Sequence, residues 1–190
     1  VKNYAVQTLW DLPHGLELYT PKFEKKLIFS GDPSRFPHIV DWKQSTPLHV
    51  YATRAEGVDY SKVHLEGWRT QQELLLELSK GGGFGLVWGN SENPAEERDY
   101  YKENVSYKLT TYLAAGIPVV VPDYLSNADY IREKGLGFVV SSLEEASRVV
   151  QECTAEEYDQ MVTRAKYTAY LIKNGYFTKK LFIDSMMLLD

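Results

Sequence analysis

The sequence predicts an α/β protein in which a doubly wound parallel sheet is covered by helices on both faces. Short β-rich runs alternate with helical patterns along most of the chain, which is typical of such sheets. Residues 117–121 form an almost unbroken β-branched run, and a run of this kind indicates a strand buried on both faces. The 190 residues, 44% of them hydrophobic, are sufficient for one globular domain with a full core.

We expect six strands, each a short run of β-branched, aromatic or other apolar residues bounded by turn residues. Glycines in the fourth run mark places where the backbone approaches another backbone or a ligand. The predicted strands cover residues 26–31, 48–52, 63–67, 82–88, 117–121 and 137–140.

We expect helices between and after these strands. Leucines at 74, 75 and 78 have the spacing of one buried helical face, and Gly116 has the position of a glycine that closes a helix. The predicted helices cover residues 71–79, 104–115, 126–134, 143–152, 155–173 and 178–189.

One long polar insertion, residues 90–99, follows the fourth strand. We interpret it as a solvated surface loop or as a lid, because ligands of such sheets bind at the carboxyl ends of the strands.

The composition excludes several classes of protein. A formal net charge of −5 argues against a duplex nucleic-acid binder, which needs a basic surface. The single cysteine, Cys153, excludes an intrachain disulfide and favours a reducing, cytoplasmic compartment. No apolar stretch approaches the roughly 20 residues of a membrane span, and no signal peptide is visible. The chain begins at Val1 without an initiator methionine, which we interpret as a domain of a longer protein.

The strongest local signal is a polar column formed by Tyr100, Asn104 and Lys108. On a continuous helix these residues share one face and extend over about 12 Å. A phenol, an amide and an ammonium in this arrangement can bind a ribose or phosphate edge, and a helix N-terminus adds unpaired N–H donors. The alternative is an ordinary solvated helix face.

The column belongs to a longer segment, Tyr-x3-Asn-x3-Lys-x3-Tyr-Leu-Ala-Ala-Gly-x-Pro-Val-Val, over residues 100–120. This segment resembles the donor-lobe motif of bacterial GT-B glycosyltransferases, in particular the galactofuranosyltransferase-like family. That family includes glucosyltransferases that extend GlcNAc on serine-rich adhesins exported by the accessory secretion system. Residues 84–88 and 27–31 are similar to strand ends of the same family, and the resemblance covers about residues 20–150.

The resemblance implies roles for the column. In that family the matching lysine contacts the diphosphate of the sugar donor, which implies this role for Lys108. The matching asparagine and tyrosine line the same pocket, which implies binding roles for Asn104 and Tyr100. Many retaining GT-B enzymes also carry two glutamates around this helix. Here Glu103 stands at the first position and Thr111 at the second, so their mechanism does not transfer and the catalytic residues are unassigned.

Gly31 ends the first strand and is followed by Asp-Pro-Ser-Arg. A glycine there lets the backbone approach a phosphate, and Arg35, at the start of the next helix, can clamp it with two hydrogen bonds. GT-B enzymes often pair an arginine from this turn with the lysine of the later helix, which implies that Arg35 and Lys108 neutralise UDP without a metal. A plain turn with a surface arginine is the alternative. The further glycines of G-x-G-x-x-G are missing, which disfavours a nicotinamide oxidoreductase.

Aromatic residues follow the second and third strands. Tyr51 ends the second strand, and Gly67 and Trp68 follow the third, at the edge where a nucleotide base would lie. A base can stack on an aromatic face, whereas an aromatic side chain packed under a loop is the alternative.

These observations define the expected organisation and function. Residues 1–20 would lead in from a missing N-terminal lobe, residues 21–153 would form a Rossmann-like domain that binds a nucleotide sugar, and residues 154–190 would form C-terminal helices. The chain would be the C-terminal, UDP-sugar-binding lobe of a GT-B glycosyltransferase that transfers a hexose such as glucose onto a glycan of a serine-rich adhesin.

Two other functions remain open, a non-catalytic scaffold of a glycosyltransferase complex and a UDP-sugar epimerase. We expect no metal and no cofactor, and the glycan or glycoprotein acceptor would bind through the missing lobe. The tyrosine-rich terminal helices leave a homo-oligomer open.

Overall fold

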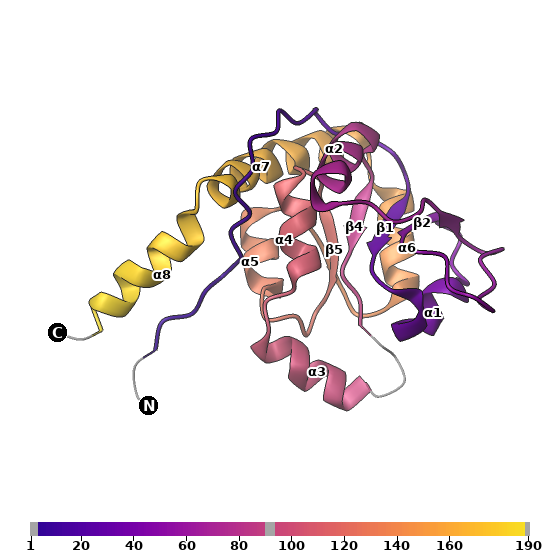
Figure 1. Ribbon diagram of the computed structural model, residues 1–190, viewed down its shortest axis with the longest axis horizontal. Helices are drawn as coiled ribbons and strands as arrows, with labels where there is room; N and C mark the ends of the chain where they lie inside the picture. The colour runs from indigo at the N-terminus through magenta and orange to yellow at the C-terminus, as the bar shows by residue number, and fades with distance from the viewer. Residues whose placement is uncertain (1–3, 90–93, 189–190) are drawn as a thin grey trace.

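Six parallel strands form the centre of the protein (Figure 1). They lie in the order β3-β2-β1-β4-β5-β6, in a computed structural model that describes residues 4–89 and 94–188. This is the strand order of a Rossmann-like doubly wound sheet, so the predicted fold class is confirmed. The strands are β1 Leu27–Ser30, β2 Leu48–Tyr51, β3 His64–Leu65, β4 Phe84–Leu86, β5 Val119–Pro122 and β6 Gly137–Val140.

Helices cover both faces of this sheet. Helices α2, α4 and α5 contribute to one core, α1 and α6 to the other, and α7 to both. Figure 1 shows α7 across one end of the sheet and α3 near the opposite end. The helices are α1 Pro37–Val40, α2 Gln71–Gly81, α3 Pro94–Glu103, α4 Tyr107–Ala114, α5 Ala128–Lys134, α6 Leu143–Glu152, α7 Ala155–Lys173 and α8 Tyr176–Met186.

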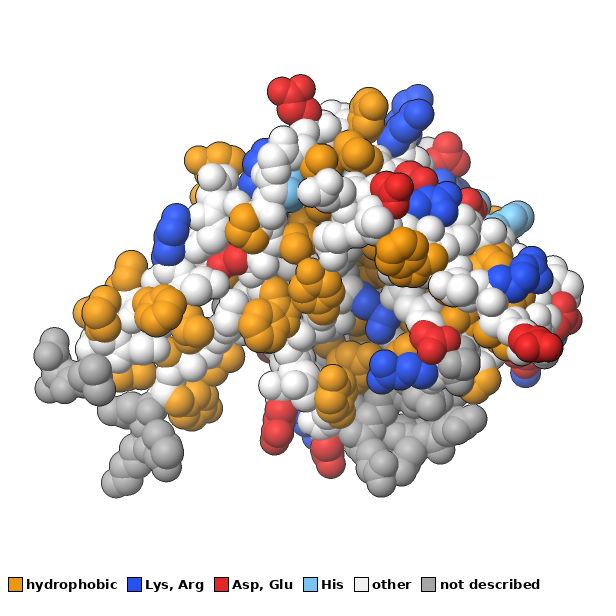
Figure 2. Space-filling model, in the orientation of Figure 1, with side chains coloured by type: hydrophobic (Ala, Val, Ile, Leu, Met, Phe, Trp, Pro, Cys, Tyr) orange, Lys and Arg blue, Asp and Glu red, His pale blue; other side chains and the backbone are white. Residues whose placement is uncertain are grey.

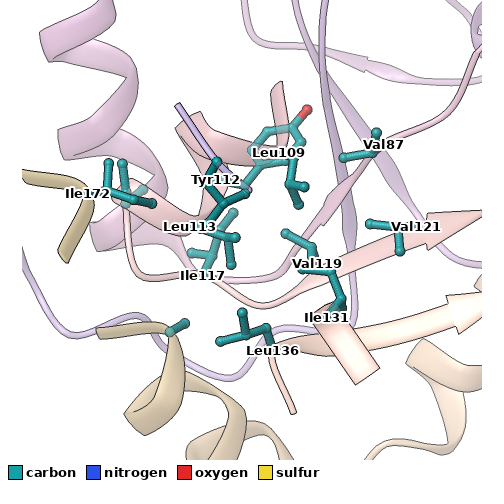
Figure 3. Packing of buried hydrophobic residues seen from close by; sticks show 14 of the residues in the cluster. Val87, Leu109, Tyr112, Leu113, Ile117, Val119, Val121, Ile131, Leu136 and Ile172 are labelled. Atoms are coloured by element: carbon teal, nitrogen blue, oxygen red, sulfur yellow. The ribbon is translucent and has the colours of Figure 1, made fainter. Parts of the chain in front are cut away.

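The apolar strands follow from this double cover. In β1, Leu27 and Phe29 belong to the core beneath α1 and α6, whereas Ile28 belongs to the core beneath α2 and α4. Successive side chains of a strand point to opposite faces, so a strand covered on both faces needs apolar residues throughout. Figure 3 shows the core beneath α2 and α4, where Leu109 and Leu113 of α4 pack together with Val119 of β5.

Local capping sets the starts of the late helices. The Ser142 hydroxyl accepts a hydrogen bond from the Glu145 N–H, and Thr154 and Glu157 form a reciprocal capping box. The bounds predicted for α6 and α7 are confirmed. Strand β3, by contrast, is shorter than the predicted residues 63–67.

The predicted continuous helix 104–115 is wrong at its start. Helix α3 ends at Glu103 and α4 begins at Tyr107, so the three residues between them interrupt the helix. Helix α3 also occupies part of the polar insertion 90–99, and residues 90–93 of that insertion lie outside the described residues.

Distant side chains stabilise this interruption. The Trp10 indole N–H donates to the Val105 carbonyl at 3.0 Å, and the Ser126 hydroxyl donates to the Asn104 carbonyl at 3.0 Å. A helix break leaves backbone groups without their helical partners, and these two contacts satisfy two of them, the carbonyls of Asn104 and Val105.

The N-terminal segment lies along the last two helices (Figure 1). The Asp11 carboxylate accepts hydrogen bonds from the N–H groups of Phe177 and Thr178, which caps the start of α8, and the Leu12 N–H donates to the Ile172 carbonyl. The division into residues 1–20, 21–153 and 154–190 stays a prediction. Within the described ranges, no helix has the length and hydropathy that crossing a membrane requires.

Candidate functional site

The carboxyl end of β1 meets the start of α4 beside β4, where the strand order changes direction. A Cβ at Gly31 would lie 3.0 Å from Lys108 Cε and 3.0 Å from a ring carbon of Phe29. Glycine therefore leaves the room in which the lysine stem passes the backbone. Crevices at such switch points are the usual ligand sites of open α/β sheets, and two of the predicted site residues meet here.

Tyr112 fixes the position of α4 at this point. Its ring is fully buried beneath β4, and a Cβ at Gly85 would come within 2.3 Å of it. Its hydroxyl accepts a hydrogen bond from the Ser30 N–H at 2.8 Å, at the end of β1. Burial raises the pKa of this phenol, which stays neutral. Because Lys108 lies one helical turn before Tyr112, this anchor places the ammonium at the end of β1.

The ammonium of Lys108 lies against two aromatic rings. Its Nζ is 5.3 Å from the ring centroid of Phe29 and 4.7 Å from that of Phe36. Burial, followed by the nearby Arg35 guanidinium, lowers the pKa of Lys108 to about 8. The ring faces attract a cation but offer no hydrogen-bond acceptor, so an anion bound here would be well placed to neutralise Lys108.

Arg35 contributes a second positive charge. It ends a short 3₁₀ helix, Pro33–Arg35, and does not begin the next α-helix as the sequence suggested. Its exposed guanidinium lies 5.9 Å from the ring centroid of Phe36, so both cations contact the same ring. A nucleotide diphosphate, with its spread negative charge, matches two cations held in this way.

A pocket of about 550 Å³ continues from Gly31 along the ends of β1 and β2. Figure 2 shows a hollow on this face of the molecule, with hydrophobic and charged side chains around it. Its wall includes Tyr51, Trp68, Arg69 and Leu74, and its volume is typical of a small-molecule site.

A network of polar contacts holds the aromatic wall of this pocket. Burial, followed by Glu77, raises the pKa of Tyr51 to about 12. Glu77 also accepts a hydrogen bond from Arg69 Nε, and Arg69 Nη1 donates to the Trp68 carbonyl at 3.0 Å. The turn before Trp68 requires glycine, because Gly67 has a φ of +83° and a residue with a side chain would be strained in that conformation. The Trp68 indole is 64% exposed, which leaves it accessible for stacking.

Tyr100 and Asn104 do not form a column with Lys108. Tyr100 lies in the last turn of α3 and Asn104 directly follows that helix, where its amide donates to the Tyr100 carbonyl at 2.9 Å. The Tyr100 ring is exposed and contacts Tyr101. The break before α4 separates them from the helix of Lys108, and their binding roles stay predictions.

Several residues of this site were not among the predicted site residues, and Tyr112, Phe29 and Phe36 are the ones that position Lys108. Tyr112 is part of the motif that carries the family resemblance, and its spacing of four from Lys108 indicates a common helical face. The sequence indicated Phe29 only as a residue of the first strand and gave no sign that its ring contacts Lys108. Phe36 had no signal, because it follows a turn whose geometry the local pattern does not define.

The chain matches known families and structures. The family described as "Glucosyltransferase 3-like, C-terminal domain" matches residues 27–185. Glucosyltransferase 3 of Streptococcus gordonii is 53% identical over 98% of this chain and 56% of its own length. Beta-1,6-galactofuranosyltransferase WbbI of Escherichia coli (strain K12) is 27% identical over 81% of this chain and 47% of its own length. The crystal structure of Anabaena Alr3699/HepE in complex with UDP-glucose superposes with a TM-score of 0.53 at 12% identity, covering 88% of this chain and 48% of that one.

The strand order and the similarity to the HepE structure define a doubly wound, Rossmann-like lobe with its candidate site at the switch point. The chain belongs to the glucosyltransferase 3-like family, which confirms the predicted resemblance. It spans about half the length of the curated relatives that it matches.

Proposed function

We propose that this chain is the donor-binding lobe of a glycosyltransferase and that it holds a UDP-sugar at the carboxyl edge of its sheet. The observation that carries the proposal is the half-buried ammonium of Lys108, which lies beside Gly31, a residue that also lines the aromatic pocket. The diphosphate would contact Lys108 and Arg35, and the uracil would stack near Tyr51 and Trp68.

Charge stabilisation is the chemical role of such a site. Negative charge develops on the nucleoside diphosphate as the sugar leaves, and fixed cations in a partly dry site lower the energy of that transition state. The ammonium of Lys108 is held by packing before the ligand arrives, so little reorganisation is needed. Two protein cations would serve without a metal, so the proposal includes none.

The identity of the transferred sugar and of the acceptor depends on the whole protein, of which this chain would be one lobe. The name of the Streptococcus gordonii relative supports a glucosyl donor, and the family resemblance supports a glycan on a serine-rich adhesin as acceptor. The acceptor and any catalytic base would come from a second lobe, so we expect the 190 residues to bind UDP and to transfer little sugar alone. A cytoplasmic location fits the single free cysteine, Cys153.

Titration calorimetry with UDP tests the proposal. Lys108→Ala should lower the affinity by about 1.5–3 kcal/mol, as expected for a charge-assisted contact. Lys102→Ala is the matched control, because Lys102 is an exposed lysine on α3 that pairs with Asp99, and it should leave the affinity unchanged.

The outcomes separate the functions. Loss of affinity in the first variant alone supports the donor lobe. Unchanged affinity in Lys108→Ala removes that residue from the site, and failure of the unaltered chain to bind UDP or UDP-glucose would favour the scaffold.

A further inference from the structure

Two polar side chains join α2 to α4 beside the candidate site. The Tyr107 hydroxyl donates to Gln71 Oε1 at 3.1 Å, and these residues are the first of α4 and of α2. They connect two helices that each contribute to the site, because Leu74 of α2 lines the pocket and Lys108 belongs to α4.

The amide of Gln71 has an unused donor. Its Nε2 is enclosed, and within the described part of the chain it has no hydrogen-bond partner. Turning the amide by 180° exchanges its oxygen and nitrogen and leaves one polar atom without a partner in either orientation. A buried polar group in this state lowers stability, so its presence calls for an explanation such as a ligand.

The position of this pair matches one part of a nucleotide. Gln71 follows Trp68 and Arg69 and precedes Leu74, all of which line the aromatic pocket. Tyr107 directly precedes Lys108, which lies at the diphosphate end. The ribose is the part of a nucleotide between base and diphosphate, and its two hydroxyls both donate and accept hydrogen bonds.

We propose that Gln71 and Tyr107 recognise the ribose hydroxyls of the bound nucleotide. The inference rests on the proposed UDP-sugar site and assigns one part of that ligand to two residues. The Tyr107 ring is 52% exposed, so it can turn and admit a hydroxyl to the Gln71 amide at low cost. Together the two side chains then distinguish a ribonucleotide from a nucleotide without these hydroxyls.

Calorimetry with UDP and with 2′,3′-dideoxyuridine diphosphate tests this assignment. The unaltered chain should prefer UDP roughly tenfold, as one or two net hydrogen bonds provide. Gln71→Met keeps the length and removes the amide, so it should weaken UDP and leave the dideoxy ligand almost unchanged, which abolishes most of the preference. Tyr107→Phe should reduce the preference in the same way. Gln72→Met, the exposed neighbour on the same helix, should keep it.

Each result decides the question. Equal affinity of the unaltered chain for both ligands, or an undiminished preference in Gln71→Met and Tyr107→Phe, overturns the ribose assignment while the UDP site stands. Equal weakening of both ligands assigns the pair to another part of the ligand and also overturns it. Absence of UDP binding to the unaltered chain overturns the proposed function itself. If Gln71→Met does not fold by circular dichroism, Tyr107→Phe decides alone, because its ring is half exposed.

Discussion

At one end of the candidate site Lys108 lies on two buried rings and its helix is anchored in the core, whereas at the other end Trp68 stands exposed on a loop. The buried end is fixed by the Tyr112 hydroxyl on Ser30 and by the ring of Tyr112 beneath Gly85. The exposed end is fixed near the surface by Arg69, which forms an ion pair with Glu77 and donates a hydrogen bond to the Trp68 carbonyl.

This difference predicts how the two ends respond to substitution. Changes near the buried end alter folding and binding together, because the same contacts serve both. Changes at the exposed end alter binding alone, since surface substitutions seldom affect stability by more than about 0.5 kcal/mol.

The largest expected effect is that of Gly85→Ala. The added Cβ would come 2.3 Å from the Tyr112 ring, and β4 is held between β1 and β5, so neither side can move without loss of packing. We expect the free energy of unfolding to fall by about 3 kcal/mol, measured by urea denaturation. Gly15→Ala is the control, because nothing lies within 4 Å of its Cβ. Equal stability of the two variants would mean that Tyr112 does not anchor α4 as described.

Next in size is Trp68→Ala at the exposed end. Stacking of a base on an aromatic ring contributes about 1–3 kcal/mol, so UDP affinity should fall by about 2 kcal/mol in calorimetry. The affinity for inorganic pyrophosphate and the melting temperature should stay the same, because neither depends on this ring. Tyr167→Ala removes another exposed aromatic ring, on α7, and should have no effect on UDP. A parallel loss of pyrophosphate affinity would contradict the separation of the two ends.

The hydrophobic periodicity and the motif of residues 100–120 were enough to predict the sheet and the general position of the buried end of the site. The β-branched run of β5 and the leucines of α2 point to buried faces without any tertiary information. The strand pattern placed Gly31 at the end of the first strand, and the motif placed Lys108 near the start of the helix that precedes the fifth strand. A parallel sheet brings strand ends and the starts of the following helices to one edge. These features depend on local pattern and on one topological rule.

The break between α3 and α4 could not be predicted in this way. The spacing of Tyr100, Asn104 and Lys108 suggested a continuous helix, but Trp10 and Ser126 bind carbonyls at the break from positions far away in the sequence. Such contacts are invisible to a local reading, and the error displaced Tyr100 and Asn104 from the column. The contact between the Phe36 ring and the Lys108 ammonium also depends on tertiary structure and could not be predicted from the local sequence.

The pH dependence of UDP affinity distinguishes the two ends of the site, because Lys108 at the buried end titrates near neutral pH and Tyr51 in the aromatic pocket does not. In the free protein Lys108 has a pKa of about 8, and a bound diphosphate favours its protonated form. Binding above that pH therefore takes up a proton, so the contribution of Lys108 to affinity is complete only well below pH 8, and affinity falls roughly tenfold between pH 7 and 9. Tyr51, with a pKa of about 12, does not titrate in this window. Lys108→Ala removes the contribution of this lysine to the pH dependence of UDP affinity and leaves only that of the ligand's own phosphate groups. An equal slope in both proteins would contradict the assignment.

The smallest expected effect is that of metal removal. If Lys108 and Arg35 neutralise the diphosphate, calorimetry of UDP in EDTA and in magnesium chloride should give the same affinity. Lys108 and the exposed Arg35 both contact one ring at the buried end of the site, so a metal would have to compete with two positive charges for the same phosphate oxygens. A clear gain with magnesium would mean that these cations are insufficient. The buried end would then position a metal complex of the nucleotide, and its fixed geometry would select the shape of that complex in addition to its charge.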